Sequence, residues 1–121
     1  MLRDPGMFLP DILEACAKVR VLVAGMDLPA FSGDWRTRDA ALHNLEVIGE
    51  AVKRLPDELK AMHPAVPWKR IAGFRKVLVH AYFTLNDSII WDVATHEVES
   101  LAETASLMLK QLDSTKTSGP N

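Results

Sequence analysis

The chain lacks most of the sequence signals of disulfide-linked, secreted or membrane-spanning proteins. It has a single cysteine, Cys16, so no internal disulfide can form, and we expect a buried, inert thiol in a reducing compartment. No apolar run approaches the roughly 20 residues that cross a bilayer. The N-terminus also lacks the basic-then-apolar pattern of a signal peptide. We therefore expect a cytoplasmic protein with no membrane partner.

The signatures of several enzyme classes are also missing. His43, His63 and His96 lie far apart in the sequence without metal-ligand spacing, and one cysteine adds little to them, so a zinc site is not expected. The chain has no glycine-rich phosphate loop and no Gly-x-Ser-x-Gly nucleophile motif. The sequence thus predicts neither a metal site nor a cofactor.

Strand signals are scarce, and helical periodicity dominates the 121 residues, of which 48% are hydrophobic. The pattern predicts an all-α fold, an antiparallel bundle of four to five helices that forms one domain over residues 1–113. A flexible tail is expected over residues 114–121. The expected helices are 10–24, 37–55, a short one within 56–63, 68–82, and 86–112 with a bend near Thr95 and His96.

The formal net charge of −2 argues against a nucleic-acid partner, but the charge is unevenly distributed. Residues 51–80 carry seven basic against two acidic side chains, a net of +5. The segments before and after them have net charges of −3 and −4. A solvated helix surface would explain this cluster, and so would a phosphate-binding face.

The basic segment ends in Arg75, His80 and Tyr82, which fall within eight residues of the expected 68–82 helix. Arginine binds phosphate bidentately and keeps its charge, whereas histidine exchanges a proton near pH 7. Such a pair could cleave RNA without a metal, since that reaction needs proton transfer and a cation at the phosphate. A snorkelling arginine and a hydrogen-bonded histidine at a helix end would leave the same pattern.

A helical wheel separates these residues. Tyr82 falls on the core-facing stripe with Arg75 near its edge, while Gly73, Lys76 and His80 lie on the opposite side. Arg75 and His80 diverge by about 140° in an ideal helix. Glycine within a helix costs roughly 1 kcal/mol, so Gly73 suggests a close contact with a second protomer. A two-fold dimer would then bring two copies of Arg75 and His80 together.

The expected 37–55 helix contains a second unusual glycine, Gly49, followed by Glu50. A mid-helix glycine again invites close packing, here with the helix that carries Arg75 and His80. Glu50 would then pair with Arg75 or another cation, although a solvated carboxylate is the simpler interpretation.

Three segments in order, Leu45–Ala51, Val66–Arg75 and Arg75-x4-His80-x-Tyr82, resemble the HepT-like family of HEPN ribonuclease toxins. The resemblance covers roughly residues 8 to 112. Arg-x4-His alone occurs by chance in many proteins. Its combination with the Gly-Glu-Ala and Pro-Trp elements at these separations makes the resemblance specific.

The resemblance implies a homodimeric, metal-independent endoribonuclease toxin that cleaves RNA and is neutralised by a nucleotidyltransferase-fold antitoxin. Arg75 and His80 match the family's catalytic arginine and histidine. Tyr82 matches the tyrosine that the antitoxin modifies with AMP. Supporting roles in RNA binding are expected for four nearby side chains, those of Glu50, Lys69, Arg70 and Lys76.

One position departs from the family pattern. The residue after the arginine is usually asparagine or another small polar residue, and here it is Lys76. A lysine one turn before His80 adds a phosphate contact and could alter catalysis, or abolish it while binding is retained. Two functions therefore remain open: an active ribonuclease toxin, or a catalytically inactive helical dimer that binds a nucleotidyltransferase partner. A purely structural helical subunit is the third hypothesis.

Overall fold

A computed structural model describes the backbone of residues 7–117 and the side chains of residues 7–112. Over this range the chain is helical and contains no strand, which confirms the predicted all-α fold. The segments are α1 (Phe8–Val23), α2 (Leu28–Ser32), α3 (Trp35–Lys53), α4 (Asp57–Ala61), α5 (Trp68–Ala72), α6 (Phe74–Phe83), α7 (Asp87–Asp92), the π-helical η2 (Val93–Glu97) and α8 (Val98–Thr117).

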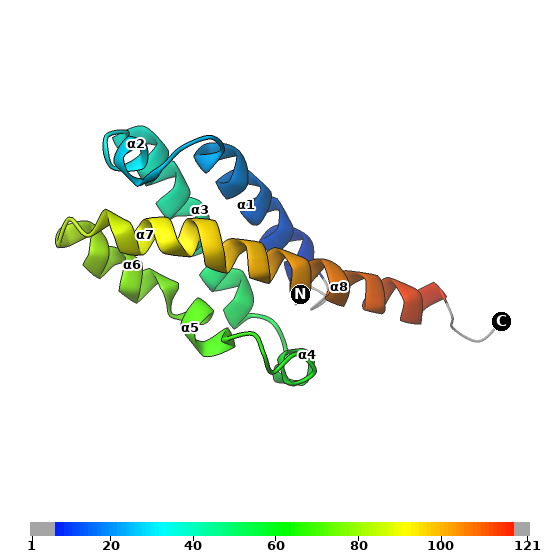
Figure 1. Cartoon of the computed structure of the whole chain (residues 1–121). Helices are drawn as coiled ribbons and strands as arrows, with labels where there is room; N and C mark the ends of the chain where they lie inside the picture. The colour runs from blue at the N-terminus through cyan, green and yellow to red at the C-terminus, as the bar shows by residue number, and fades with distance from the viewer. Residues whose placement is uncertain (1–6, 118–121) are drawn as a thin grey trace.

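The core lies where three long segments meet. α1 and α3 pack side by side in opposite directions, and α7, η2 and α8 follow one another as a rod that crosses them (Figure 1). α6 packs on α3 and α7 and runs antiparallel to the rod. The long helices bury the apolar stripes that their periodicity predicts. Fully buried members include Ile12, Val19, Leu45, Ile48, Leu78 and Ile90.

Aspartate side chains cap the two helices that follow α1. Asp27 accepts a hydrogen bond from the Ala30 N–H at 3.0 Å and begins α2. Asp34 begins α3 by accepting from the Thr37 N–H at 3.1 Å and the Thr37 hydroxyl at 2.7 Å. These hydrogen bonds hold the pKa of Asp34 below its usual value, since they favour the ionised carboxylate.

The predicted continuous helix over 68–82 is wrong, because the chain breaks at Gly73 into α5 and α6. A Cβ at Gly73 would meet the Lys69 carbonyl at 3.4 Å, so this glycine serves a junction within the chain. The close approach occurs at Gly49, where a Cβ would lie 3.0 Å from the Ile71 carbonyl oxygen. The predicted packing of Gly49 against the segment that carries Arg75 and His80 is therefore confirmed.

The long C-terminal helix follows its prediction with two differences. The expected bend near Thr95 is a π-helical segment, η2, in which the Thr95 hydroxyl donates to the Trp91 carbonyl at 2.8 Å. α8 continues to Thr117, so residues 114–117 are helical where a tail was expected, and 118–121 lie outside the described residues. No helix in the described range is long and apolar enough to span a membrane.

Candidate functional site

A groove of about 790 Å³ runs along α6 and gathers the predicted catalytic residues. α6 contributes Arg75, Lys76, Val79, His80 and Phe83, while Lys53 reaches in from α3, and Ala72 and Gly73 close one end. Arg75 and His80 thus share one groove although an ideal helix sets them far apart in angle. Arg75 stands in the first turn of α6, and an arginine side chain is long enough to reach the groove from another side of the helix.

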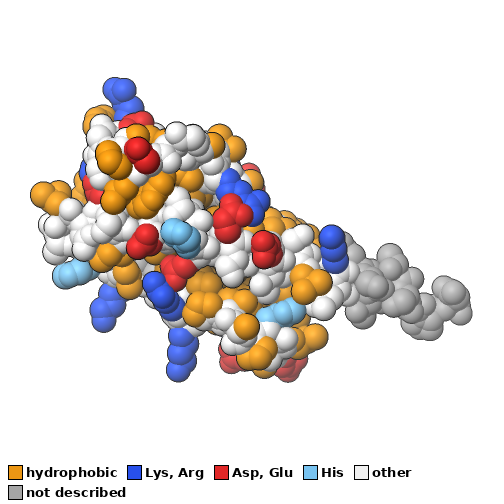
Figure 2. Space-filling view, viewed as in Figure 1, with side chains coloured by type: hydrophobic (Ala, Val, Ile, Leu, Met, Phe, Trp, Pro, Cys, Tyr) orange, Lys and Arg blue, Asp and Glu red, His pale blue; other side chains and the backbone are white. Residues whose placement is uncertain are grey.

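The electrostatics of the groove favour an anion. Its lining has three cations and one histidine and includes no carboxylate from the described part of the chain. Neither Arg75 nor Lys76 forms an ion pair with a described side chain, and the His80 ring has no hydrogen-bond partner among them. Figure 2 shows Lys and Arg side chains projecting from the lower edge of the molecule, beneath α5 and α6. The side chains of Arg75, Lys76 and His80 are therefore available to a phosphate.

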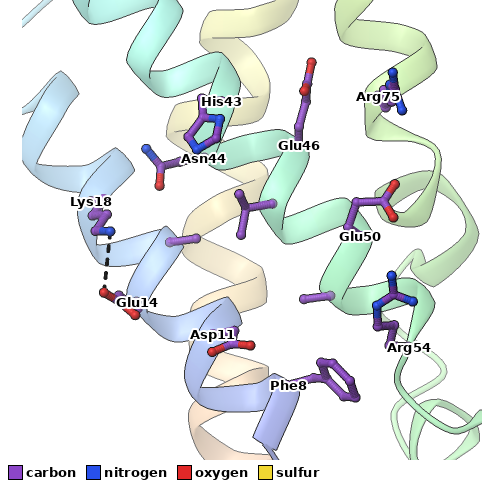
Figure 3. A pocket seen from close by; sticks show the side chains of 13 residues that line it. Phe8, Asp11, Glu14, Lys18, His43, Asn44, Glu46, Glu50, Arg54 and Arg75 are labelled. Atoms are coloured by element: carbon purple, nitrogen blue, oxygen red, sulfur yellow. Dashed lines mark ion pairs between the residues drawn. The ribbon is translucent and has the colours of Figure 1, made fainter. Parts of the chain in front are cut away.

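A second pocket, of about 520 Å³, lies between α1 and α3 and has a lining of mixed charge (Figure 3). It is lined by four carboxylates, those of Asp11, Glu14, Glu46 and Glu50, and by three cations, Lys18, Arg54 and Arg75. Arg75 stands at its rim, across from α3, and therefore borders both cavities (Figure 3). Because the groove along α6 has cations without a described carboxylate, it favours a polyanion more than this mixed pocket does.

The predicted supporting residues divide between the two cavities and the surface. Glu50 lines the pocket between α1 and α3 and pairs with Lys53 at 3.2 Å, so of the anticipated partners, Arg75 or another cation, it is another cation that is observed. Lys76 lines the groove, as its position one turn before His80 predicts.

Lys69 and Arg70 are exposed on α5 and line neither cavity. The Arg70 Nε lies 2.9 Å from the Glu97 Oε1. Burial of the Glu97 carboxyl raises the pKa of that group, and the positive charge of Arg70 acts in the opposite direction. The structure therefore gives Arg70 a protein partner, and RNA contacts by Lys69 and Arg70 stay a prediction.

Tyr82 does not face the core, contrary to the wheel: 38% of its surface is exposed. The Arg38 guanidinium lies 5.5 Å from the centre of its ring, and the Phe83 ring packs against it edge-on at 5.5 Å. Tyr82 belongs to the last turn of α6. Its neighbours on α3 there include the polar residues Arg38 and Asp39. Tyr82 is therefore partly open to solvent, and its modification stays a prediction.

Two lining residues of the groove were not predicted. Phe83 follows His80 by three positions, so helical spacing could have placed it on the same face. Lys53 comes from another helix and carried no signal beyond its charge. Within residues 7–117 no group of three or more His, Cys, Asp or Glu side chains could hold a metal ion.

Comparison with known proteins identifies the family of the chain. The family model described as Ribonuclease HepT-like matches residues 12–108. The chain belongs to the HepT-like ribonuclease family. This confirms the resemblance found in the sequence and places the chain, in coarse terms, among ribonucleases.

Three named relatives align with this chain over most of their own length. A protein of Methanocaldococcus jannaschii with a provisional RNase name is 37% identical over 92% of each chain. One of Caldanaerobacter subterraneus, similarly named, is 37% identical over 91% of this chain and 98% of its own. The probable ribonuclease HepT of Thermococcus cleftensis is 34% identical over 84% and 92%. No solved structure matches the chain significantly.

Proposed function

We propose that the chain is a metal-independent endoribonuclease that cleaves RNA in the groove along α6. One observation carries the proposal: Arg75 and His80, neither engaged by another described side chain, line one groove that contains no described carboxylate. Arg75 and Lys76 bind the phosphate, and His80 transfers protons.

The reaction needs two proton transfers. A base takes the proton of the ribose 2′-hydroxyl, whose oxygen attacks phosphorus, and the bond to the 5′-oxygen breaks as an acid protonates that oxygen. The products are a 2′,3′-cyclic phosphate and a 5′-hydroxyl. Arg75 and Lys76 stabilise the negative charge that develops on the phosphoryl oxygens. One protomer supplies one histidine to the groove, so the second proton transfer calls for another copy.

A two-fold homodimer supplies that copy. An isologous interface along α6 would bring two His80 rings to a shared cleft. Exposed aliphatic side chains on and just after α6 support such a contact: Val77 is 42%, Val79 37% and Leu85 83% exposed. Val77 and Val79 lie on different sides of α6, about 160° apart in an ideal helix, so each offers exposed apolar surface for a contact.

In the cell we propose a toxin–antitoxin role, in which a nucleotidyltransferase-fold antitoxin neutralises the enzyme by adding AMP to Tyr82. The resemblance to HEPN toxins motivates this role, and the exposure of Tyr82 two residues from His80 supports it. An added phosphate there would compete with RNA for the cations of the groove and repel the substrate backbone.

The test compares cleavage of a labelled RNA by wild type, Arg75→Ala and His80→Ala, each with and without EDTA. We expect equal wild-type activity with the chelator, a cyclic phosphate product, and a loss of 10²-fold or more in both variants. His96→Ala, an exposed histidine on η2, serves as the control. Loss of activity in EDTA, or an active His80→Ala protein, would contradict the mechanism.

Lys76 gives the second candidate a specific basis, since its ammonium group lies in the groove beside the proposed catalytic histidine. If the chain is an inactive binding module, wild type leaves RNA intact, Lys76→Asn restores cleavage, and a nucleotidyltransferase partner still binds. If it is an enzyme, Lys76→Asn changes an activity that wild type already has.

A further inference from the structure

We propose that Phe83 is the stacking platform for an unpaired nucleobase, and hence that the groove along α6 takes single-stranded RNA. The inference rests on the proposed ribonuclease function and specifies its substrate. It begins from an aromatic ring that is 77% exposed and lines the same groove as Arg75, Lys76 and His80.

The order of side chains along α6 matches the order of groups in a nucleotide. Lys76, His80 and Phe83 are spaced by four and three positions, so they stack on one helix face, with roughly 10 Å of rise from first to last. The cations at one end suit the phosphate, and the ring at the other suits the base. His80 stands between them, where the ribose carries its 2′-hydroxyl.

The ring of Phe83 contacts one neighbouring ring and is otherwise exposed to solvent. Tyr82 packs against it in a T-shaped arrangement with ring centres 5.5 Å apart, and the Arg38 guanidinium in turn lies over Tyr82 at 5.5 Å. Contact from one side limits the ring's motion, while most of its surface stays open to solvent. An exposed aromatic ring fixed in this way can receive a base without much further ordering.

The charges around Phe83 favour a nucleic acid over a protein partner at this position. Every ionisable side chain from the described residues that lines the groove is basic or a histidine. A second copy seated symmetrically over Phe83 would set Arg75 and Lys76 against their own equivalents, whereas a phosphodiester chain neutralises them.

The base on Phe83 must be unpaired. In duplex RNA both faces of a base are covered by its neighbours, and proteins reach A-form helices mainly through their shape, 2′-hydroxyls and phosphates. Stacking is also tolerant of base identity, because every base has a π face. We therefore expect cleavage confined to loops, ends and single strands, with little preference imposed by Phe83 itself.

Binding is measured by fluorescence anisotropy of a labelled single-stranded oligoribonucleotide, with all variants in a His80→Ala background that removes cleavage. Phe83→Leu keeps apolar bulk and loses the ring, so we expect its Kd to rise about tenfold. Phe83→Trp should bind as tightly as the parent, and Trp35→Leu, which removes a 59% exposed ring of α3 outside the groove lining, is the control. The same RNA annealed to its complement should bind the parent at least tenfold more weakly.

An unchanged Kd for Phe83→Leu, or equal binding of paired and unpaired RNA, would overturn the proposal. So would a Phe83→Leu protein that becomes monomeric in sedimentation, because the ring would then belong to a protein interface. Catalysis is judged separately: wild type that binds through Phe83 but leaves RNA intact refutes the proposed nuclease activity and leaves the stacking site standing.

Discussion

Arg75 lines both the pocket between α1 and α3 and the basic groove along α6, yet it pairs with no described carboxylate. Lys53 pairs with Glu50 at 3.2 Å and thereby removes one competitor for the Arg75 guanidinium. Arg75, which we propose binds the phosphate, is therefore left without an ion pair among the described side chains.

Cys16 shows the opposite behaviour, a reactive group type made inert by its place in the core. Its thiol is 1% exposed, which agrees with the predicted buried cysteine. Burial raises the pKa of Cys16 to about 11, with a smaller lowering effect from Arg20 and a raising effect from Glu99. The thiolate, which is the nucleophile, is thus almost absent at neutral pH.

We predict that iodoacetamide modifies Cys16 at pH 8 at least roughly a hundredfold more slowly in the native protein than in urea. Because the folded-state pKa is raised, the stability contributed by the neutral thiol is full below its ordinary value of 9.0 and is lost as the pH rises toward 11. Cys16→Ser provides the unlabelled control. Equal rates with and without urea would show that the thiol is accessible.

At the scale of elements, the junction between α5 and α6 fixes the groove. α5 approaches α3 so closely that a Cβ on Gly49 would come within 3.0 Å of the Ile71 carbonyl and 3.5 Å of the Phe74 Cβ. The chain then turns at Gly73 from α5 into α6. The position of Arg75 thus depends on the close approach at Gly49 and on the turn that follows α5.

We predict that Gly49→Val lowers the free energy of unfolding by about 1–3 kcal/mol, because the added methyl groups push α5 away from α3. Urea denaturation checks this value. His43→Val, at an exposed position of the same helix, controls for the helix propensity of valine. If both variants lose the same stability, close packing at Gly49 is not the cause.

At the scale of the molecule, the helices enclose one core and leave the groove face of α6 uncovered (Figure 1). The proposed dimer would form beside the groove, through exposed aliphatic side chains such as Val77 and Leu85, and it explains why a single histidine per chain is sufficient. A site shared by two copies also makes activity depend on association.

We predict a solution mass near twice the chain's 13.4 kDa and a specific activity that falls on dilution. Val77→Glu, beside the groove on α6, should yield monomers and lower cleavage more than tenfold, since it buries a charge in the interface. Val21→Glu, on a 77% exposed residue of α1, should do neither. Sedimentation and a cleavage assay over a range of concentrations measure both, and a fully active wild-type monomer would refute the dimer.

Much of the fold followed from local patterns. The stripes of α1, α3 and α8 and the close packing at Gly49 were predictable, because period and side-chain size act within a few residues. The residue types at Arg75, His80 and Tyr82, together with the Gly-Glu-Ala and Pro-Trp elements before them, were enough to suggest the family. These features belong to the sequence by itself.

Only the tertiary structure decided how those residues meet. The arrival of Lys53 in the groove and the exposure of Tyr82 depend on which helix lies opposite, and no local pattern encodes that. A wheel assumes an endless helix with one buried side. α6 instead begins at a turn and ends past the core, so packing between distant segments determined which side chains share the groove.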